Sequence, residues 1–377
     1  REMLEPTAFF ETLGVHYLGP FDGHDIPEIE EALENAKAFD GPVVVHVLTQ
    51  KGRGYEPAEL DPIKHMHDTS GIKPGSYTEA FTEALVKVAE SRPNLVAITA
   101  AMPDSTGLLP FRERFPDRCF DVGIAEQHAV TSAAGMAMGG LRPVLAVYST
   151  FLTRAIDQVN LDVALHGQPV VFCLDRAGIT GDDGPSHHGL LDLVLLSKVP
   201  GMTIFAPSSY QEVQQMLEDA LELCDGPAAI RWPKTTAPHV GWDETGSGLM
   251  GRQVRRGTDV CLLGAGKMLA AASGAAELLA PDGISTTVWD PRVICPLDPA
   301  MLADAARHPL VVTVEDGFCE GGFGTAVRST LADTSPAIRV EAMGVPIAHH
   351  DHGKPDDLLS SFGLDAEGVA ERVRRSI

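Results

Sequence analysis

The chain has 377 residues, with 29 Lys or Arg against 52 Asp or Glu, so its formal net charge is −23. That charge argues against nucleic acid as the main partner, because binding to phosphates requires clustered cations. With 44% hydrophobic residues the chain is too apolar to be disordered, and its apolar runs fall short of the ~18 residues that a membrane span needs. At roughly 150 residues per domain, the length corresponds to two or three domains.

Cysteine usage favours a reducing compartment. The six cysteines occur singly, with no CxxC pair, at positions 119, 173, 224, 261, 295 and 319. This spacing predicts neither a structural zinc site nor a disulfide framework, so we expect a cytoplasmic protein. The chain begins at Arg1, with no initiator Met or signal peptide, inside what reads as a domain.

Short apolar runs alternate with amphipathic segments. We expect strands within 41–49, 95–100, 143–149, 169–175, 202–208, 228–232, 259–266, 285–290 and 310–316. We expect helices at Tyr77–Glu90, Glu126–Met138, Gln211–Leu223 and Met268–Leu279. The runs are rich in Val, Ile and Leu without strict alternation, as in strands covered on both faces. The pattern predicts an α/β fold with doubly wound, mostly parallel sheets.

Two weakly periodic stretches, 52–76 and 233–258, are rich in Gly, Pro and charge and read as linkers. They divide the chain into an N-terminal remnant of about 60 residues, a middle domain at 75–235 and a C-terminal domain at 255–377.

The first candidate for chemistry is Glu126, which opens a helix rich in Ala and Gly. An acid in a first turn can simply complement the helix dipole. Closely spaced small residues instead indicate a buried helix, in which a carboxyl group needs a specific partner.

Next, Tyr148, Phe151 and Arg154 directly follow an expected strand. In parallel sheets ligands bind at this carboxyl end, so the three side chains could stack on a ligand and bind an anion. The same segment also reads as a strand-to-helix connection capped by Ser149 or Thr150, and the two interpretations are compatible.

The third candidate is the Gly-rich segment 175–192, which carries Arg176, Asp182, Asp183, His187 and His188. It has few bulky apolar residues, and loops on a scaffold are where catalytic groups concentrate. Metal ligation by these acids and histidines is an alternative, although their spacing matches no common metal pattern.

Two further motifs carry weaker signals. The Gly-rich stretch 315–324 precedes a helix but lacks the GxGxxG pattern and a lysine, so we expect a close-packed turn and not a phosphate loop. The HHDH run at 349–352 could bind a metal, but its Pro/Gly/Asp context favours a solvated loop.

Five stretches together carry a family resemblance: LGPFDGHD (18–25), KGRGYEPAE (51–59), FPDRCFDVGIAEQHAV (115–130), YSTFLTRAIDQV (148–159) and DRAGITGDDGPSHHG (175–189). In this order they resemble the 1-deoxy-D-xylulose-5-phosphate synthases, thiamine-diphosphate enzymes of the transketolase superfamily. The resemblance implies condensation of pyruvate with D-glyceraldehyde 3-phosphate, with loss of CO₂, to 1-deoxy-D-xylulose 5-phosphate. It also implies a role at the start of non-mevalonate isoprenoid biosynthesis, and a homodimer.

The resemblance further implies the tail of a diphosphate-binding domain at 1–68, a pyrimidine-binding domain at 75–235 and a transketolase C-terminal domain at 255–377. The family's GDG…N segment, which holds Mg²⁺ and the diphosphate, is absent from these 377 residues. We therefore expect no metal ligands within this chain.

Site roles carry over position by position. Glu126 matches the acid that hydrogen-bonds the cofactor's pyrimidine, Ile124 the apolar wedge beside it, and Phe151 the ring that stacks on it. His187 and Asp183 match an acid/base pair.

The remaining matches lie on the substrate side. Tyr148, Arg154 and Arg176 match polar and phosphate-side positions, and His67 matches a linker histidine near the thiazolium. Lys234 stands where many relatives have Arg, which keeps the charge but loses the bidentate fork. Arg154, Arg176 and Lys234 are thus expected to form a cationic patch for a sugar phosphate.

Two alternatives stay open. A beta subunit of a 2-oxoacid dehydrogenase has a similar length and the same two complete domains, although residues 1–68 and the loop 175–189 argue against it. A non-catalytic fragment is the other alternative, because the diphosphate site is missing.

Overall fold

The computed structural model describes residues 6–62, 65–67 and 71–377. It divides the chain into two compact units, Arg1–Ser70 and Gly71–Ile377. No helix among the described residues is long and apolar enough to cross a membrane.

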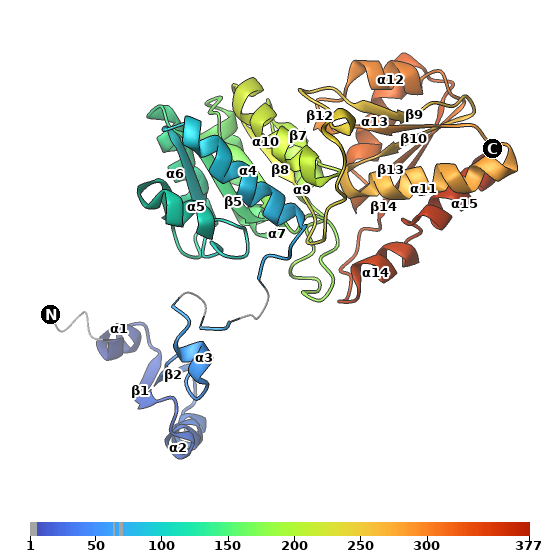
Figure 1. The fold of residues 1–377 in the computed structure, drawn as a ribbon. Helices are drawn as coiled ribbons and strands as arrows, with labels where there is room; N and C mark the ends of the chain where they lie inside the picture. Colours follow the sequence, from blue (N-terminus) through green and yellow to red (C-terminus); the bar gives the residue numbers. More distant parts are fainter. Residues whose placement is uncertain (1–5, 63–64, 68–70) are drawn as a thin grey trace. The chain divides into compact units, whose positions relative to one another are not determined.

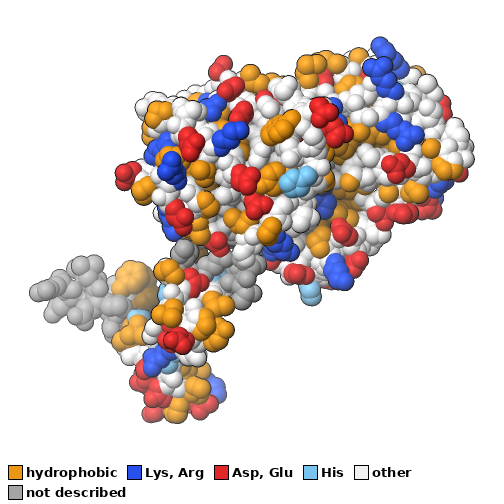
Figure 2. Space-filling model, in the orientation of Figure 1, with side chains coloured by type: hydrophobic (Ala, Val, Ile, Leu, Met, Phe, Trp, Pro, Cys, Tyr) orange, Lys and Arg blue, Asp and Glu red, His pale blue; other side chains and the backbone are white. Residues whose placement is uncertain are grey.

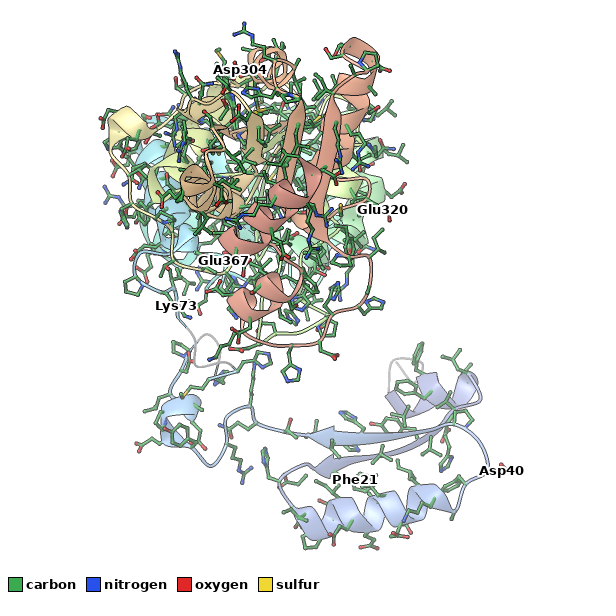
Figure 3. All side chains as sticks on the ribbon, turned by 90° about the vertical axis from the view of Figure 1, so that its right-hand side faces the viewer. Phe21, Asp40, Lys73, Asp304, Glu320 and Glu367 are labelled. Carbon is green, nitrogen blue, oxygen red and sulfur yellow. The ribbon has the colours of Figure 1, made fainter. Side chains whose placement is uncertain are left out.

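The first unit is a two-stranded parallel sheet with helix α2 along one face (Figure 3). Asp25 begins α2 by accepting a hydrogen bond from the backbone N–H of Glu28. The elements are α1 (Pro6–Thr12), β1 (His16–Asp22), α2 (Ile26–Lys37), β2 (Val43–Leu48) and α3 (Glu56–Glu59). The core is small, and residues of β2 stay half-buried or exposed.

The second unit begins with a seven-stranded sheet in the order β12-β7-β8-β6-β5-β3-β4, parallel except for β12. Its strands are β3 (Leu95–Thr99), β4 (Cys119–Asp121), β5 (Arg142–Tyr148), β6 (Val171–Asp175), β7 (Thr203–Phe205), β8 (Ala228–Arg231) and β12 (Val293–Cys295). Apolar side chains fill both faces of β3, β5 and β6, which explains their unbroken apolar sequence.

Helices cover both faces of this sheet, and α4 and α10 lie side by side on one of them (Figure 1). Ser76 and Ser209 cap these two helices by accepting hydrogen bonds from Glu79 and Glu212 N–H groups. The helical elements are α4 (Tyr77–Ser91), α5 (Leu109–Arg114), η2 (Pro116–Arg118), α6 (Glu126–Met138), α7 (Ser149–Leu152), η3 (Thr153–Ala155), α8 (Ile156–Gln158), η4 (Val159–Ala164), α9 (Asp192–Leu196), α10 (Tyr210–Leu223) and η5 (Trp242–Glu244).

A second sheet of five strands follows, in the order β14-β13-β10-β11-β9, with only β9 antiparallel among the described strands. Its strands are β9 (Arg252–Arg255), β10 (Val260–Gly264), β11 (Thr286–Asp290), β13 (Leu310–Phe318) and β14 (Arg339–Val345). The helices are η6 (Gly266–Met268), α11 (Leu269–Leu279), η7 (Ala280–Asp282), α12 (Pro299–Ala305), α13 (Phe323–Thr334), α14 (Pro355–Ser361) and α15 (Ala366–Ser376).

Buried arginines join the two sheets. On β8, Arg231 Nε donates to Asp192 at 2.7 Å and Nη1 donates to Asp316, on β13 of the other sheet, at 2.5 Å. Burial lowers the pKa of Arg231, but the two carboxylates outweigh it and raise that pKa overall. Arg292 is fully buried and donates from Nε to Glu212, on α10, at 2.7 Å. Arg231 therefore bridges the two sheets through carboxylates that are buried from water.

The α/β fold with mostly parallel sheets is confirmed, and the expected helix Glu126–Met138 has the bounds of α6. One strand lies where the sequence does not suggest it. Val293–Cys295 belongs to the expected C-terminal domain, yet it pairs with β7 of the seven-stranded sheet. The three-domain boundaries stay a prediction. On the face drawn in Figure 2, acidic side chains are scattered, with no single acidic patch.

Candidate active site

The candidate site lies at the carboxyl ends of three neighbouring strands. In the register of the sheet, Tyr148 at the end of β5 faces Asp175 at the end of β6, and Leu174 faces Arg231 of β8. The segments expected to carry chemistry directly follow these ends. The topology therefore brings together residues from 148–158, 175–192 and 231–234.

Glu126 begins α6 and is 3% exposed. Its Oε1 accepts a hydrogen bond from Nη1 of Arg154 at 2.9 Å, and the Arg154 side chain is 51% exposed. Ala129, Ala133 and Ala137 of the same helix are buried, so α6 packs closely on β5. The carboxyl group thus has the specific partner that a buried acid requires.

Aromatic rings link this carboxylate to the loop after β6. Arg154 lies over the ring of Phe151 at 5.0 Å, and Phe151 stacks on Tyr148 at 5.4 Å between centroids. The ring of His187 meets Phe151 edge-on at 5.3 Å. Glu126 and His187 are therefore connected through Arg154 and Phe151, and Phe151 is only partly buried.

Arg176 directly follows β6 and has a backbone φ of +60°. Its Nη1 lies 3.0 Å from Asp175 and donates to the Ser105 carbonyl at 2.7 Å, while its guanidinium lies over Tyr148 at 4.3 Å. Burial lowers the pKa of Arg176, but the charge of Asp175 outweighs it and raises that pKa. Burial raises the pKa of Tyr148 against the opposing effect of the Arg176 charge. Arg176 therefore combines a left-handed backbone conformation with side-chain contacts to Asp175, Ser105 and Tyr148.

The loop after β6 closes on itself. Gly178 and Gly189 exchange backbone hydrogen bonds of 2.8 Å, and a Cβ at Gly178 would lie 2.4 Å from Oδ2 of Asp316. Within the loop, Asp183 accepts a hydrogen bond from Nζ of Lys234 at 2.7 Å. Its neighbour Asp182 is exposed, so the carboxylate that faces Lys234 is that of Asp183.

The expected cationic patch takes a different form. Each of its three members is paired with a carboxylate: Arg154 with Glu126, Arg176 with Asp175, and Lys234 with Asp183. A sugar phosphate would therefore meet cations that already share their charge with acids.

Two further predicted residues are exposed. Ile124 is 81% exposed, two residues before Glu126. His67 is exposed and belongs to the first unit, so its proximity to the site stays a prediction.

Metal ligation by the loop finds no support in the described part of the chain, where no three His, Cys, Asp or Glu side chains gather around a possible ion. The close-packed turn expected at 315–324 is confirmed. Glu315 accepts hydrogen bonds from the N–H groups of Phe323 and Gly324, so a side chain of the protein fills the start of α13.

Arg231 and Ser105 are not among the residues expected from the sequence, and His188 is expected only as a possible metal ligand. Arg231 stands three residues before Lys234, and its burial in an apolar strand was the available signal. Ser105 contacts Arg176 and Tyr148 from a loop after β3, and no motif marks it.

Sequence models of known families match three successive stretches of the chain. The sequence model of the transketolase pyrimidine-binding domain matches residues 73–239. That of the transketolase C-terminal domain matches 250–369, and that of 1-deoxy-D-xylulose-5-phosphate synthase matches 1–49. A solved structure described as "Split gene transketolase, inactive beta4 tetramer" is 30% identical, with a TM-score of 0.73, and is covered over 97% of its length and 80% of this chain.

The chain belongs to the transketolase family of transferases. Within this family it is 45% identical to the 1-deoxy-D-xylulose-5-phosphate synthase of Thermobifida fusca and 46% identical to synthase 1 of Streptomyces coelicolor. These alignments cover 99% and 100% of the chain but 61% and 59% of the relatives. The resemblance drawn from the five stretches is thereby confirmed. A Pichia stipitis transketolase, 18% identical with a TM-score of 0.68, shares the fold.

Proposed function

We propose that this chain is the pyrimidine-binding and C-terminal part of a thiamine-diphosphate-dependent 1-deoxy-D-xylulose-5-phosphate synthase. The complete protein would condense pyruvate with D-glyceraldehyde 3-phosphate, releasing CO₂. The observation that carries the proposal is the convergence of Glu126, Phe151 and His187 at the carboxyl ends of β5 and β6.

The side chains fit an aminopyrimidine. A carboxyl group that is 3% exposed lies next to a partly exposed aromatic ring, so one group can hydrogen-bond a ring nitrogen while the other stacks on the ring. In this assignment Glu126 and Phe151 hold the cofactor, with Ile124 beside it. Thiamine diphosphate, when bound, supplies the nucleophilic carbon that takes up the 2-oxo acid.

The loop supplies acid–base groups. His187 donates or accepts a proton at a substrate hydroxyl, with Asp183 as its partner in this role. The hydroxyl of Ser186 lies 2.9 Å from Nδ1 of His187, which orients the ring. Arg176 and Lys234, together with Tyr148, would bind the phosphate and polar groups of the aldehyde substrate, and we keep Arg154 as a phosphate-side candidate and His67 as a group near the thiazolium.

The proposed cofactor site also depends on the part of the relatives that this chain does not span. We assign Mg²⁺ and the diphosphate to that portion, so the chain alone should bind thiamine diphosphate weakly or not at all. Six free thiols favour action in the cytoplasm.

We also propose a homodimer. Helix α6 and segment η4 lie against each other. They and the residues that flank them leave apolar side chains exposed: Ile124 81%, Met138 57%, Leu161 46% and Leu165 72%. A second copy of the protein would cover this surface. Light scattering on the complete protein tests it, and a monomer with these residues exposed would contradict it.

Product analysis tests the activity. The complete protein, supplied with thiamine diphosphate, Mg²⁺, pyruvate and glyceraldehyde 3-phosphate, should yield 1-deoxy-D-xylulose 5-phosphate by mass spectrometry. Acetyl transfer to lipoamide without that product would instead identify a 2-oxoacid dehydrogenase beta subunit. Tight, Mg²⁺-dependent binding of thiamine diphosphate by this chain alone, measured by calorimetry, would contradict the assignment of the diphosphate site.

A further inference from the structure

In the loop that carries Asp183 and His187, the buried residue His188 directly follows the proposed catalytic histidine. His188 is 7% exposed, whereas its neighbour His187 is only partly buried. The N–H groups of both histidines donate to the carbonyl of Gly184, at 3.0 and 3.2 Å. The two residues therefore share one backbone turn, and holding His188 restricts His187.

The ring of His188 is held at both nitrogens. Nδ1 accepts a hydrogen bond from the backbone N–H of Thr180 at 3.1 Å and lies 3.1 Å from the Thr180 hydroxyl. Because a backbone N–H can only donate, Nδ1 carries no proton, and the proton of the neutral ring is on Nε2. Nε2 lies 3.4 Å from the carbonyl of Asp351 and donates toward it. Burial lowers the pKa of His188, which favours this neutral form.

The Asp351 carbonyl belongs to the C-terminal segment 349–355, which packs along the loop. The N–H of Gly353 donates to the Gly181 carbonyl at 3.4 Å. A Cβ at Gly181 would lie 2.8 Å from Cδ of Pro355, and a Cβ at Gly184 would lie 3.5 Å from Cβ of His352. The HHDH run thus lies against the loop through its backbone and His352, so it has a packing role.

We propose that His188 is a positioning residue for the reaction, which fixes the loop of His187 and Asp183 between Thr180 and the backbone of Asp351. This inference rests on the proposed function of His187. It assigns the second histidine of the pair a role distinct from its neighbour: His188 holds the loop, and His187 meets the substrate. It also makes the segment after β14 a support for a loop that leaves the seven-stranded sheet.

The test compares His188→Ala with His188→Gln in the complete protein, because the Gln amide keeps one acceptor for Thr180 and one donor for Asp351. His349→Ala, an exposed change in the HHDH run at 349–352, is the matched control. Amide hydrogen exchange of segment 178–189, measured by mass spectrometry, reports the loop independently of activity. We expect exchange about tenfold faster in His188→Ala, with His188→Gln and His349→Ala close to the parent.

Kinetics supply the second readout. We expect kcat of His188→Ala to fall by about 10- to 100-fold with little change in KM, because a displaced acid–base group loses its alignment. His188→Gln should restore most of that loss. Unchanged exchange in His188→Ala, or equal loss of kcat in both variants, would overturn the proposal. If the parent protein makes no deoxyxylulose phosphate, the proposed function fails, and the exchange measurement alone then decides whether His188 holds the loop.

Discussion

Arg154 donates a hydrogen bond from Nη1 to Oε1 of Glu126 at 2.9 Å, so a cation that is about half exposed covers a carboxylate that is 3% exposed. The pairing joins two residues for which the sequence implied separate roles, one at the cofactor and one at the substrate phosphate. If Glu126 binds the cofactor as proposed, Arg154 holds that acid in position.

Glu126→Ala and Glu126→Gln should abolish turnover while leaving the fold intact. We expect at least a 100-fold loss of kcat, about what a positioned proton-transfer group contributes. The stability loss should stay near 1 kcal/mol or below, because Arg154 can be hydrated once its partner is removed. Steady-state kinetics and urea unfolding measure both quantities, with Asp157→Asn on the exposed surface as control. Retained activity in Glu126→Ala would overturn the cofactor assignment.

Arg154→Met and Lys234→Met should affect different ligands. If Arg154 acts through Glu126, its loss should raise the Kd for thiamine diphosphate more than the KM for glyceraldehyde 3-phosphate. Loss of Lys234 should raise that KM by about tenfold or more, the worth of one charge-assisted hydrogen bond. Calorimetry and kinetics on the complete protein separate the two. Equal increases in KM with unchanged cofactor binding would restore the phosphate role for Arg154.

Arg231→Met should destabilise the second unit by about 3–5 kcal/mol, because it leaves two carboxylates buried without their cation. Those carboxylates are Asp192 and Asp316, and the latter belongs to the other sheet. Arg307→Met is the matched control, since the Arg307 side chain is 77% exposed and its ion pair with Asp304 is long, at 3.8 Å. Its cost should be below about 1 kcal/mol. Urea unfolding of this chain measures both, and equal costs would show that the buried pairs do not hold the sheets together.

The strands read from the sequence are those whose apolar run is long enough to be covered on both faces, such as 95–100 and 169–175. Strands β4 and β12 have three residues each, and they pair with partners that no local pattern identifies. Strand β12 pairs with β7, which is distant in the sequence, so the apolar pattern of 293–295 could not place β12 in the seven-stranded sheet.

The candidate site was predictable where a residue directly follows a strand, because parallel strands end at one edge. Arg176 directly follows β6, and Tyr148 is the last residue of β5. Two ion pairs of the site were not predictable, since Glu126 and Arg154 are 28 positions apart and Asp183 and Lys234 are 51 apart. Sequence spacing also could not separate two adjacent histidines, of which one is buried against Thr180 and the other faces Phe151.

Asp290→Asn should make stability depend less on pH. Burial, and then the neighbouring charge of Glu212, raise the pKa of Asp290 from 3.8 to about 7. Between these values the folded chain holds a proton that the unfolded chain releases. The stability that Asp290 contributes to the folded chain is therefore fully present below pH 3.8 and is lost as pH rises through about 7.

The Asn variant should exceed the parent in stability at pH 5 and by a larger margin at pH 8.5, because the parent loses about 1.4 kcal/mol for each pH unit between 3.8 and about 7. Burial also raises the pKa of Glu315 to about 7, so part of the pH dependence should remain in the variant. Urea unfolding at both pH values measures the effect, with the exposed Asp117→Asn as control. A variant that is less stable than the parent at pH 8.5 would mean that the charged form of Asp290 is favoured by its contacts with Ser208 and Arg292.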